Sequence, residues 1–136
     1  MMLPDQKLLV SVHKWLEKAG QDLTACDVLL ESGTMLTGVV AFHAQHAAEK
    51  YIKALLTFRE KDFPKTHDIT HLLEIVALTD KVLAASLDAA EDLTAYGVLP
   101  RYPGDLPEIS LDEARHLYQL AIQVRDGVLA VIPPLP

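Results

Sequence analysis

Apolar residues recur at three- and four-residue steps along most of the chain, a spacing that places them on one face of an α-helix. The first periodic stretch runs from about Asp5 to Glu31 and stops at Gly33, because glycine readily takes the left-handed conformation that ends helices. The second stretch runs from about Leu36 to Arg59. Its core face is one apolar stripe made of Leu36, Val40, Ala44, Ala47, Tyr51, Leu55 and Phe58. The chain is therefore predicted to begin with two long helices.

Two shorter helices are predicted after the break at residues 61–65, which contain a proline. Thr66 or Asp68 is placed to cap the first of them through a side-chain oxygen. Its apolar residues are Leu72, Leu73, Ile75, Val76 and Leu78. Apolar positions from Leu83 to Val98 then predict a fourth helix that ends before Pro100.

A last helix follows a loop that cannot be helical. Residues 100–107 hold three prolines in eight positions, and each proline removes an amide donor and restricts the residue before it. Ser110 then caps the last helix, with Glu113 three residues later in a capping-box arrangement. There is no hairpin signal and no internal repeat. The predicted fold is all-α, a single domain over residues 1–136 built as an up-and-down bundle of four to five helices.

Composition and charge limit the classes of function that the chain can have. Half of the 136 residues are apolar and 23% are charged, which is enough apolar surface for one core. The net charge of −7 argues against binding nucleic acid or an anionic membrane through bulk charge. The charge is uneven, however: residues 50–65 carry five cations against two carboxylates, while residues 66–136 carry four cations against eleven carboxylates. A local positive patch is therefore predicted in an acidic chain.

The single cysteine and the lack of a long apolar run bear on location. Cys26 has no disulfide partner and falls on the core stripe of the first helix, so we expect a buried small apolar side chain. The apolar runs are far shorter than the roughly 20 residues that span a bilayer. The first residues also lack the pattern of a secretory signal. We expect a cytoplasmic protein that does not bind membranes.

The second helix carries the most informative polar residues. His43, His46, Lys50 and Lys53 follow at steps of three, four and three, so they line one ridge, which we expect to lie opposite the core. Two imidazoles and two ammonium groups in a row favour a phosphate ligand. The alternative is a row of solvated side chains near the end of a helix.

Two apolar residues lie beside this ridge. Val39 and Phe42 fall on a side of the helix that is otherwise expected to face solvent. Apolar residues in that position favour a second interface. We therefore predict a homodimer that uses Val39 and Phe42.

The histidines do not make a convincing metal motif. His67 and His71 are four residues apart and His43 and His46 three apart, which is enough imidazoles for a zinc site. There is no helical HExxH motif and no cysteine partner, and nothing in the sequence brings the two pairs together. The sequence accordingly predicts no metal and no other cofactor.

Three separated motifs resemble the HEPN domain family. They are AFHAQHAAEKYIKALL at residues 41–56, THDITHLL at residues 66–73 and Arg101-Tyr102-Pro103. The resemblance covers nearly the whole chain in the family's order. It implies a short all-α bundle that commonly dimerises and is often encoded beside a minimal nucleotidyltransferase in bacteria and archaea. Some members of the family are ribonuclease toxins of toxin–antitoxin pairs, and others are thought to bind nucleotides.

The resemblance also implies site residues. The ribonuclease members use an arginine followed after four to six residues by a histidine, and this chain lacks that motif: Arg59 precedes His67 by too many residues, and Arg101 has no histidine within reach. We therefore predict that the chain has no catalytic residues. The resemblance carries over Gln45, Glu49, Lys50, Lys53, His67, Arg101 and Tyr102. Together with the ridge histidines, the nucleotide- or phosphate-binding candidates are His43, His46, Lys50, Lys53, His67, Arg101 and Tyr102.

Three functions remain open at this point. The first is a nucleotide- or RNA-phosphate-binding HEPN protein that pairs with a nucleotidyltransferase and does not cut RNA. The second is a metal-independent ribonuclease toxin that assembles Arg101 with one of the histidines His43, His46 and His67. The third is a non-catalytic scaffold whose acidic part docks a basic partner.

Overall fold

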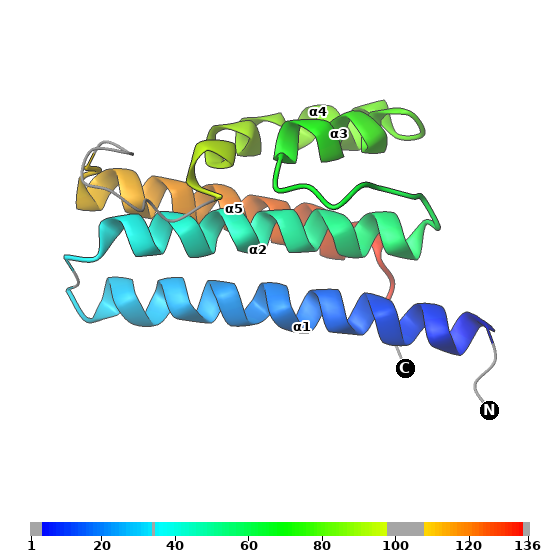
Figure 1. Ribbon diagram of the computed structural model, residues 1–136, viewed down its shortest axis with the longest axis horizontal. Helices are drawn as coiled ribbons and strands as arrows, with labels where there is room; N and C mark the ends of the chain where they lie inside the picture. The colour runs from blue at the N-terminus through cyan, green and yellow to red at the C-terminus, as the bar shows by residue number, and fades with distance from the viewer. Residues whose placement is uncertain (1–3, 34, 98–107, 135–136) are drawn as a thin grey trace.

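The computed structural model describes residues 4–33, 35–97 and 108–134, and within these ranges it contains helices and no strand. The elements in chain order are α1 (Pro4–Glu31), α2 (Thr37–Phe58), α3 (Ile69–Ala77), α4 (Lys81–Ser86), the 3₁₀ helix η1 (Asp88–Tyr96) and α5 (Leu111–Val131) (Figure 1). The predicted proline loop, with Arg101 and Tyr102, lies outside the described residues. The all-α prediction is confirmed.

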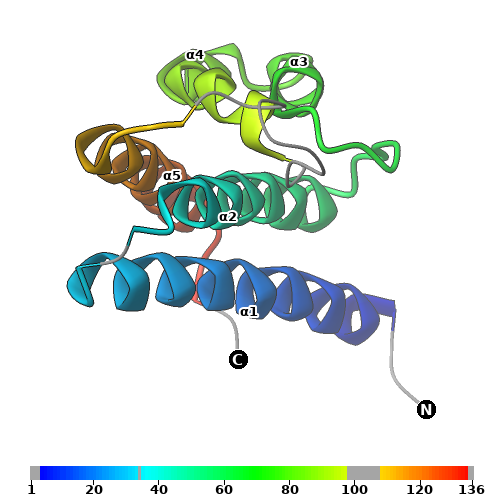
Figure 2. The same cartoon turned by 60° about the vertical axis from the view of Figure 1, so that its left-hand side comes forward.

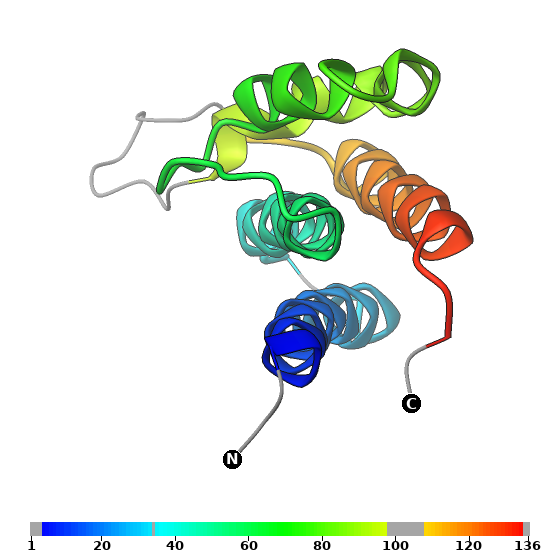
Figure 3. The ribbon, with the colours of Figure 1, turned by 90° about the vertical axis from the view of Figure 1, so that its right-hand side faces the viewer.

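The helices form three layers, with α2 at the centre. Figure 2 shows α1 on one side, α2 and α5 in the middle, and α3 with α4 on the other side. Seen end-on in Figure 3, α2 lies between α1 and α3. Because neighbours surround α2 on several sides, its side chains are buried far beyond one stripe. Its fully buried side chains include Val40, Ile52, Leu55 and Leu56.

The predicted helix boundaries at the caps are confirmed. The side chain of Asp68 accepts a hydrogen bond from the backbone N–H of His71 and begins α3. Ser110 accepts from the N–H of Glu113 at 3.0 Å and begins α5. Gly33, at φ +71°, follows the end of α1 in the left-handed region that glycine adopts without strain.

The predicted fourth helix is wrong in type and length. The α-helix stops at Ser86, and the chain continues as the 3₁₀ helix η1. The reason is the period of the buried residues: Leu87, Ala90 and Leu93 follow at three-residue steps and all lie in the core. A 3₁₀ helix has three residues per turn, so it keeps this series on one face, whereas an α-helix would rotate it away.

Residues 59–68, which we call the return segment, run back along α2 before α3 begins (Figure 1). Its second residue, Glu60, has φ 56°, which is a strained conformation for a residue with a side chain. The N–H of Lys61 donates to the carbonyl oxygen of Leu56 at 2.8 Å, so this turn closes the end of α2. The turn directs the return segment onto the polar side of α2.

Two further expectations concern the burial of Cys26 and the absence of a membrane-spanning helix. Cys26 is fully buried, as predicted, and its Sγ–H donates to the carbonyl oxygen of Val40 at 3.4 Å. Among the described residues, no helix combines the length and apolar composition needed to cross a bilayer.

Candidate functional site

Three polar side chains of α2 are buried against the return segment. Gln45, Glu49 and Lys53 follow at four-residue steps, so they lie along one face of the helix. Their exposed fractions are 0%, 2% and 6%, and side chains of these types are rarely so buried unless they are paired. We call these three residues the α2 clamp.

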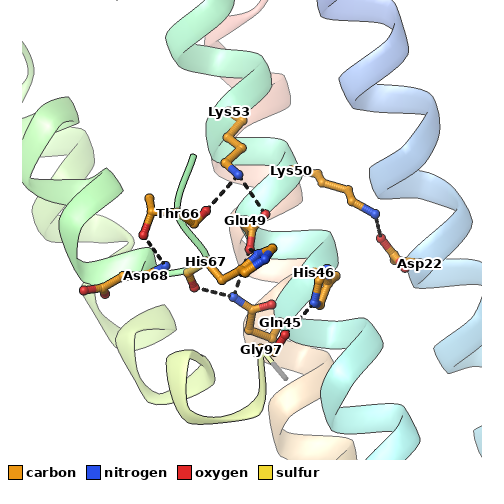
Figure 4. A network of polar contacts seen from close by, with 10 residues as sticks. All are labelled: Asp22, Gln45, His46, Glu49, Lys50, Lys53, Thr66, His67, Asp68 and Gly97. Atoms are coloured by element: carbon orange, nitrogen blue, oxygen red, sulfur yellow. Dashed lines mark hydrogen bonds and ion pairs between the residues drawn. The ribbon is translucent and has the colours of Figure 1, made fainter. Parts of the chain in front are cut away.

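Glu49 is the centre of the clamp (Figure 4). Its Oε1 accepts hydrogen bonds from Nδ1–H of His67 at 2.8 Å and from Nε2 of Gln45 at 3.3 Å, while its Oε2 accepts one from Nζ of Lys53 at 2.9 Å. Burial by itself raises the pKa of Glu49. The hydrogen bonds from Lys53 and His67, together with the charge of Lys53, outweigh burial and hold this pKa below its ordinary value. Glu49 is therefore a buried carboxylate that neutralises Lys53.

The remaining bonds of the clamp go to the backbone of the return segment. Nζ of Lys53 donates to the carbonyl oxygen of Thr66 at 2.8 Å. Nε2 of Gln45 donates to the carbonyl oxygen of His67 at 2.8 Å. Since α2 supplies these donors, the two carbonyl groups are satisfied where the segment crosses the helix. The clamp thus determines where His67 lies.

Aromatic side chains hold the same segment against α1. Phe63 meets Trp15 edge to face, with ring centroids 6.2 Å apart. Nζ of Lys53 lies 5.5 Å from the Trp15 centroid and 5.9 Å from the Phe63 centroid. Both distances are within the range of a cation–π contact. The ammonium of Lys53 is therefore surrounded by a carboxylate, a carbonyl and two rings.

His67 is the part of this network that reaches solvent. Its side chain is 62% exposed, although Nδ1 bonds the buried Glu49. A carboxylate accepts, so Nδ1 carries a hydrogen in either protonation state, and Nε2 is left for another partner. Asp68, the next residue, caps α3. The backbone of His67 is consequently held between the clamp and the start of a helix.

His46 lies beside His67, with ring centroids 5.3 Å apart. Its Nε2–H donates to the carbonyl oxygen of Gly97 at 2.8 Å, which leaves a lone pair on Nδ1 of the neutral ring. A Cβ at Gly97 would lie 3.2 Å from the amide of Gln45, so a side chain there would crowd the clamp. The site is thus built where α2, the return segment and the end of η1 meet.

The other two residues of the predicted ridge contact α1. Asp22 accepts from Nδ1–H of His43 at 2.9 Å through Oδ1 and from Nζ of Lys50 at 2.7 Å through Oδ2. Asp22 is itself buried. His43 and Lys50 therefore join α1 to α2, on a different side from the clamp.

The expectation of one exposed cationic ridge is corrected by these contacts. Lys53 is buried, and His43, His46 and Lys50 are half-buried. The reason is that other segments pack on the side of α2 that was expected to face solvent. Each of the four has a hydrogen-bond partner within the chain. Whether any of them binds phosphate stays a prediction.

The predicted local charge of residues 50–65 is also largely neutralised. Three of the five cations form direct ion pairs. Lys50 pairs with Asp22 at 2.7 Å, Lys53 with Glu49 at 2.9 Å and Arg59 with Asp80 at 3.0 Å. Lys61 and Lys65 are exposed, and within the described ranges neither has an ion pair. Of the five cations in residues 50–65, the two without an ion pair among the described residues are thus Lys61 and Lys65 of the return segment, and Lys65 comes two residues before His67.

Other predicted residues have varied positions. Val39 and Phe42 are half-buried, and the Phe42 ring packs on His46 with centroids 4.2 Å apart. Their role in a dimer stays a prediction. His71 is exposed and lies 3.6 Å from Glu74, and His43 is held by Asp22, so the described residues do not assemble four imidazoles.

Gln45 and Glu49 have a role that the sequence pattern does not predict, since the family resemblance alone marks them as candidates. In the structure they are buried partners of the return segment. A signal was present: polar residues at positions 45, 49 and 53 form a series at four-residue steps on a helix that is otherwise rich in Ala, Leu and Ile. Such a series indicates a buried polar stripe that needs partners from another segment.

Comparison with known proteins identifies the family of the chain. The family model described as HEPN domain matches residues 12–130. No curated protein and no solved structure matches the chain. The matched range includes the α2 clamp, the whole return segment and α3. Because the match extends over most of the sequence, the chain belongs to the HEPN domain family.

Proposed function

We propose that this HEPN chain binds a nucleotide or an RNA phosphate at His67, and that it does so as the non-nucleolytic partner of a minimal nucleotidyltransferase in a toxin–antitoxin-like module. One observation carries the binding proposal: the imidazole of His67 is exposed while its Nδ1–H is held by the buried carboxylate of Glu49. The partner protein is proposed from the family's usual gene arrangement.

A phosphate suits this imidazole for two reasons. Glu49 accepts from Nδ1–H, so Nε2 is the ring nitrogen that remains to contact a phosphate oxygen. Lys65 lies two residues earlier on the return segment and is exposed, which adds a cation without a carboxylate partner among the described residues. Arg101 and Tyr102 remain candidates to bind the phosphate and to stack on a base.

The predicted lysines have a different part in this proposal. Lys50 and Lys53 are occupied by Asp22 and Glu49, so a phosphate would have to compete with a carboxylate at contact distance. Their contribution is to hold α1 and the return segment in place. His67, rather than either lysine, is therefore the first residue to test.

Absence of nuclease activity is proposed from the missing arginine partner. Metal-independent cleavage of RNA needs a group to move the proton and a cation for the charge that develops on phosphorus. Arg59, the nearest arginine before His67 in sequence, is held by Asp80. This arrangement favours binding over cleavage.

One observation favours a ribonuclease as the second candidate. A buried carboxylate that orients an imidazole is the arrangement by which many enzymes prepare a histidine for proton transfer. Glu49 and His67 have this geometry at 2.8 Å. In that case Arg101 would have to supply the positive charge.

The scaffold alternative rests on the exposed carboxylates of η1 and of the first turn of α5. They are Asp88, Glu91, Asp92, Asp112 and Glu113. A basic partner would find them accessible. This surface is therefore the proposed place of protein contact.

The test is a titration of the purified protein with ATP and with a short labelled RNA, in buffer that contains EDTA. His67→Ala should weaken binding by about tenfold or more, since a hydrogen bond to a charged group contributes ~1.5–3 kcal/mol. The matched control is His71→Ala, which removes an exposed imidazole four residues away that contacts Glu74 instead. Equal affinities for the wild type and both variants, or no binding by the wild type, would reject the phosphate site.

The same RNA samples decide between the two candidates. We expect the RNA to stay intact after long incubation with the wild-type protein. Cleavage that disappears in Arg101→Ala and in His67→Ala would establish the ribonuclease and contradict the non-nucleolytic proposal. A nucleotidyltransferase gene next to that of this chain would support the partner, and copurification of the two proteins would test their contact directly.

A further inference from the structure

We infer that His46, Glu49 and His67, which we call the His67 cluster, bind one divalent transition-metal ion, for which Zn²⁺ is the best match. One nitrogen of each imidazole and one carboxylate oxygen lie within 4.8 Å of one another. Two imidazoles and a carboxylate are a donor set that zinc accepts in tetrahedral sites, with the fourth position left to water or another ligand. The inference does not depend on nucleotide binding.

The distances require only a small closure. Zinc bonds to such donors are ~2.0–2.2 Å long, so neighbouring donor atoms lie about 3.4 Å apart. The hydrogen-bonded pair, Nδ1 of His67 and Oε1 of Glu49, is already at 2.8 Å. Because the three donor atoms lie within 4.8 Å of one another, no pair has to close by more than about 1.4 Å. His67 belongs to the return segment and is largely exposed, so its side chain can move to allow this.

The imidazole of His46 is oriented as a metal ligand should be. A ligating histidine normally donates its second ring N–H to a carbonyl or carboxylate, which sets the tautomer and the ring direction. His46 makes this second bond through Nε2–H to Gly97 at 2.8 Å, so Nδ1, which keeps its lone pair, is the nitrogen that we assign to the ion. An ion bound at Nδ1 of His67 would replace the hydrogen now shared with Glu49, and the neutral ring would take its other tautomer, with the hydrogen on Nε2.

The carboxylate of Glu49 is arranged for two different partners. Oε2 is occupied by Lys53, which keeps the carboxylate anionic and fixes its direction. Oε1 faces His67 and is the oxygen available to the ion. Lys53 thus acts as the outer partner of a ligating carboxylate, which such sites commonly contain.

A second observation at the same place points to a missing ligand. Oε1 of Gln45 is fully buried and has no hydrogen-bond partner among the described residues. The same amide donates through Nε2 to Glu49 and to the carbonyl oxygen of His67. The unsatisfied oxygen therefore belongs to a side chain that contacts two residues of the His67 cluster. A buried acceptor without a donor is rare and costs about 1–3 kcal/mol. Water on a bound ion would supply the donor.

The experiment is a titration of tag-free, EDTA-stripped protein with zinc sulfate against a chromogenic zinc chelator. We expect one Zn²⁺ per chain for the wild type and loss of that site in His67→Ala. The matched controls are His71→Ala and His43→Ala, which remove neighbouring imidazoles outside the cluster and should keep the site. Circular dichroism checks that each variant is folded.

A second readout identifies the donors. Co²⁺ in a tetrahedral site gives intense visible d–d absorption, which should appear with the wild type and be absent with His67→Ala. Glu49→Asp, which keeps the charge and shortens the side chain, should shift the spectrum or weaken the site if the carboxylate is a ligand. No saturable zinc binding by the wild type, equal binding by His67→Ala, or an equal loss in His71→Ala would overturn the inference.

Discussion

Replacing Glu49 by Gln should remove a large part of the stability of this domain. The carboxylate is 2% exposed and is the counter-charge of Lys53, which is 6% exposed. Without it the ammonium of Lys53 stays buried without a counter-charge, and the NH₂ group of the new amide faces either Lys53 or the donors His67 and Gln45. Breaking one partner of a buried pair costs about 3–5 kcal/mol. Domains of this kind are stable by only about 5–15 kcal/mol in total.

The measurement is urea unfolding followed by circular dichroism at neutral pH, with EDTA present so that metal binding does not contribute. Asp22→Asn is the matched control, because it is also a change from carboxylate to amide beside a lysine. Lys50 is 23% exposed at its side chain, so water can solvate it once the carboxylate is gone. The control should therefore lose less stability than Glu49→Gln, because the cation that it leaves behind is partly solvated.

The double variant Glu49→Gln, Lys53→Met separates charge burial from general damage. If the unpaired ammonium is the cause, removing it restores part of the loss, and the two changes are non-additive by about 0.5–3 kcal/mol. A loss below about 1 kcal/mol for Glu49→Gln, a loss equal to that of Asp22→Asn, or strict additivity would refute the argument from burial.

Three smaller predictions follow from single sites. Burial, helped by the charge of Asp22, raises the pKa of Cys26 to about 12 from 9.0, so a thiol reagent at mildly alkaline pH should react slowly with the native protein and fast in urea. With the folded pKa raised, the stabilisation from the protonated thiol is complete below 9.0 and is lost as pH rises toward 12, which pH-dependent unfolding can follow. Ser110→Ala removes the cap of α5 and should lower stability by about 1 kcal/mol, whereas Ser110→Asn should change it little; thermal unfolding decides. Glu60→Gly relieves the positive φ of 56° and should raise the free energy of unfolding by up to about 1 kcal/mol, so a lower stability would contradict the strain.

The sequence predicts α1, α2 and α5 well because their signals are local. Apolar steps of three and four residues continue through each helix, and the caps at Asp68 and Ser110 depend on neighbours only three residues away. The break inside the predicted fourth helix is also local, but it requires a distinction between a period of 3.0 and one of 3.6. Leu87, Ala90 and Leu93 carry that information, and so few residues define the period weakly.

The candidate site is harder to predict because its partners are distant in sequence. Lys50 pairs with Asp22, which precedes it by 28 residues, and Arg59 pairs with Asp80. A charge count over residues 50–65 contains neither carboxylate, so it indicates a free positive patch where the fold makes ion pairs. Pairing across helices depends on packing, and no local pattern specifies it.

The structure gives the most conspicuous sequence motif a positioning role. Gln45, Glu49 and Lys53 bind the backbone and the imidazole of the return segment, and His67 is the member that reaches solvent. A substitution of Glu49 or Lys53 therefore removes a charge and also a bond that holds the return segment and His67 in place. A loss of RNA binding in a Lys53 variant would for this reason report the position of His67, because the ammonium is buried and already bonded to Glu49 and Thr66.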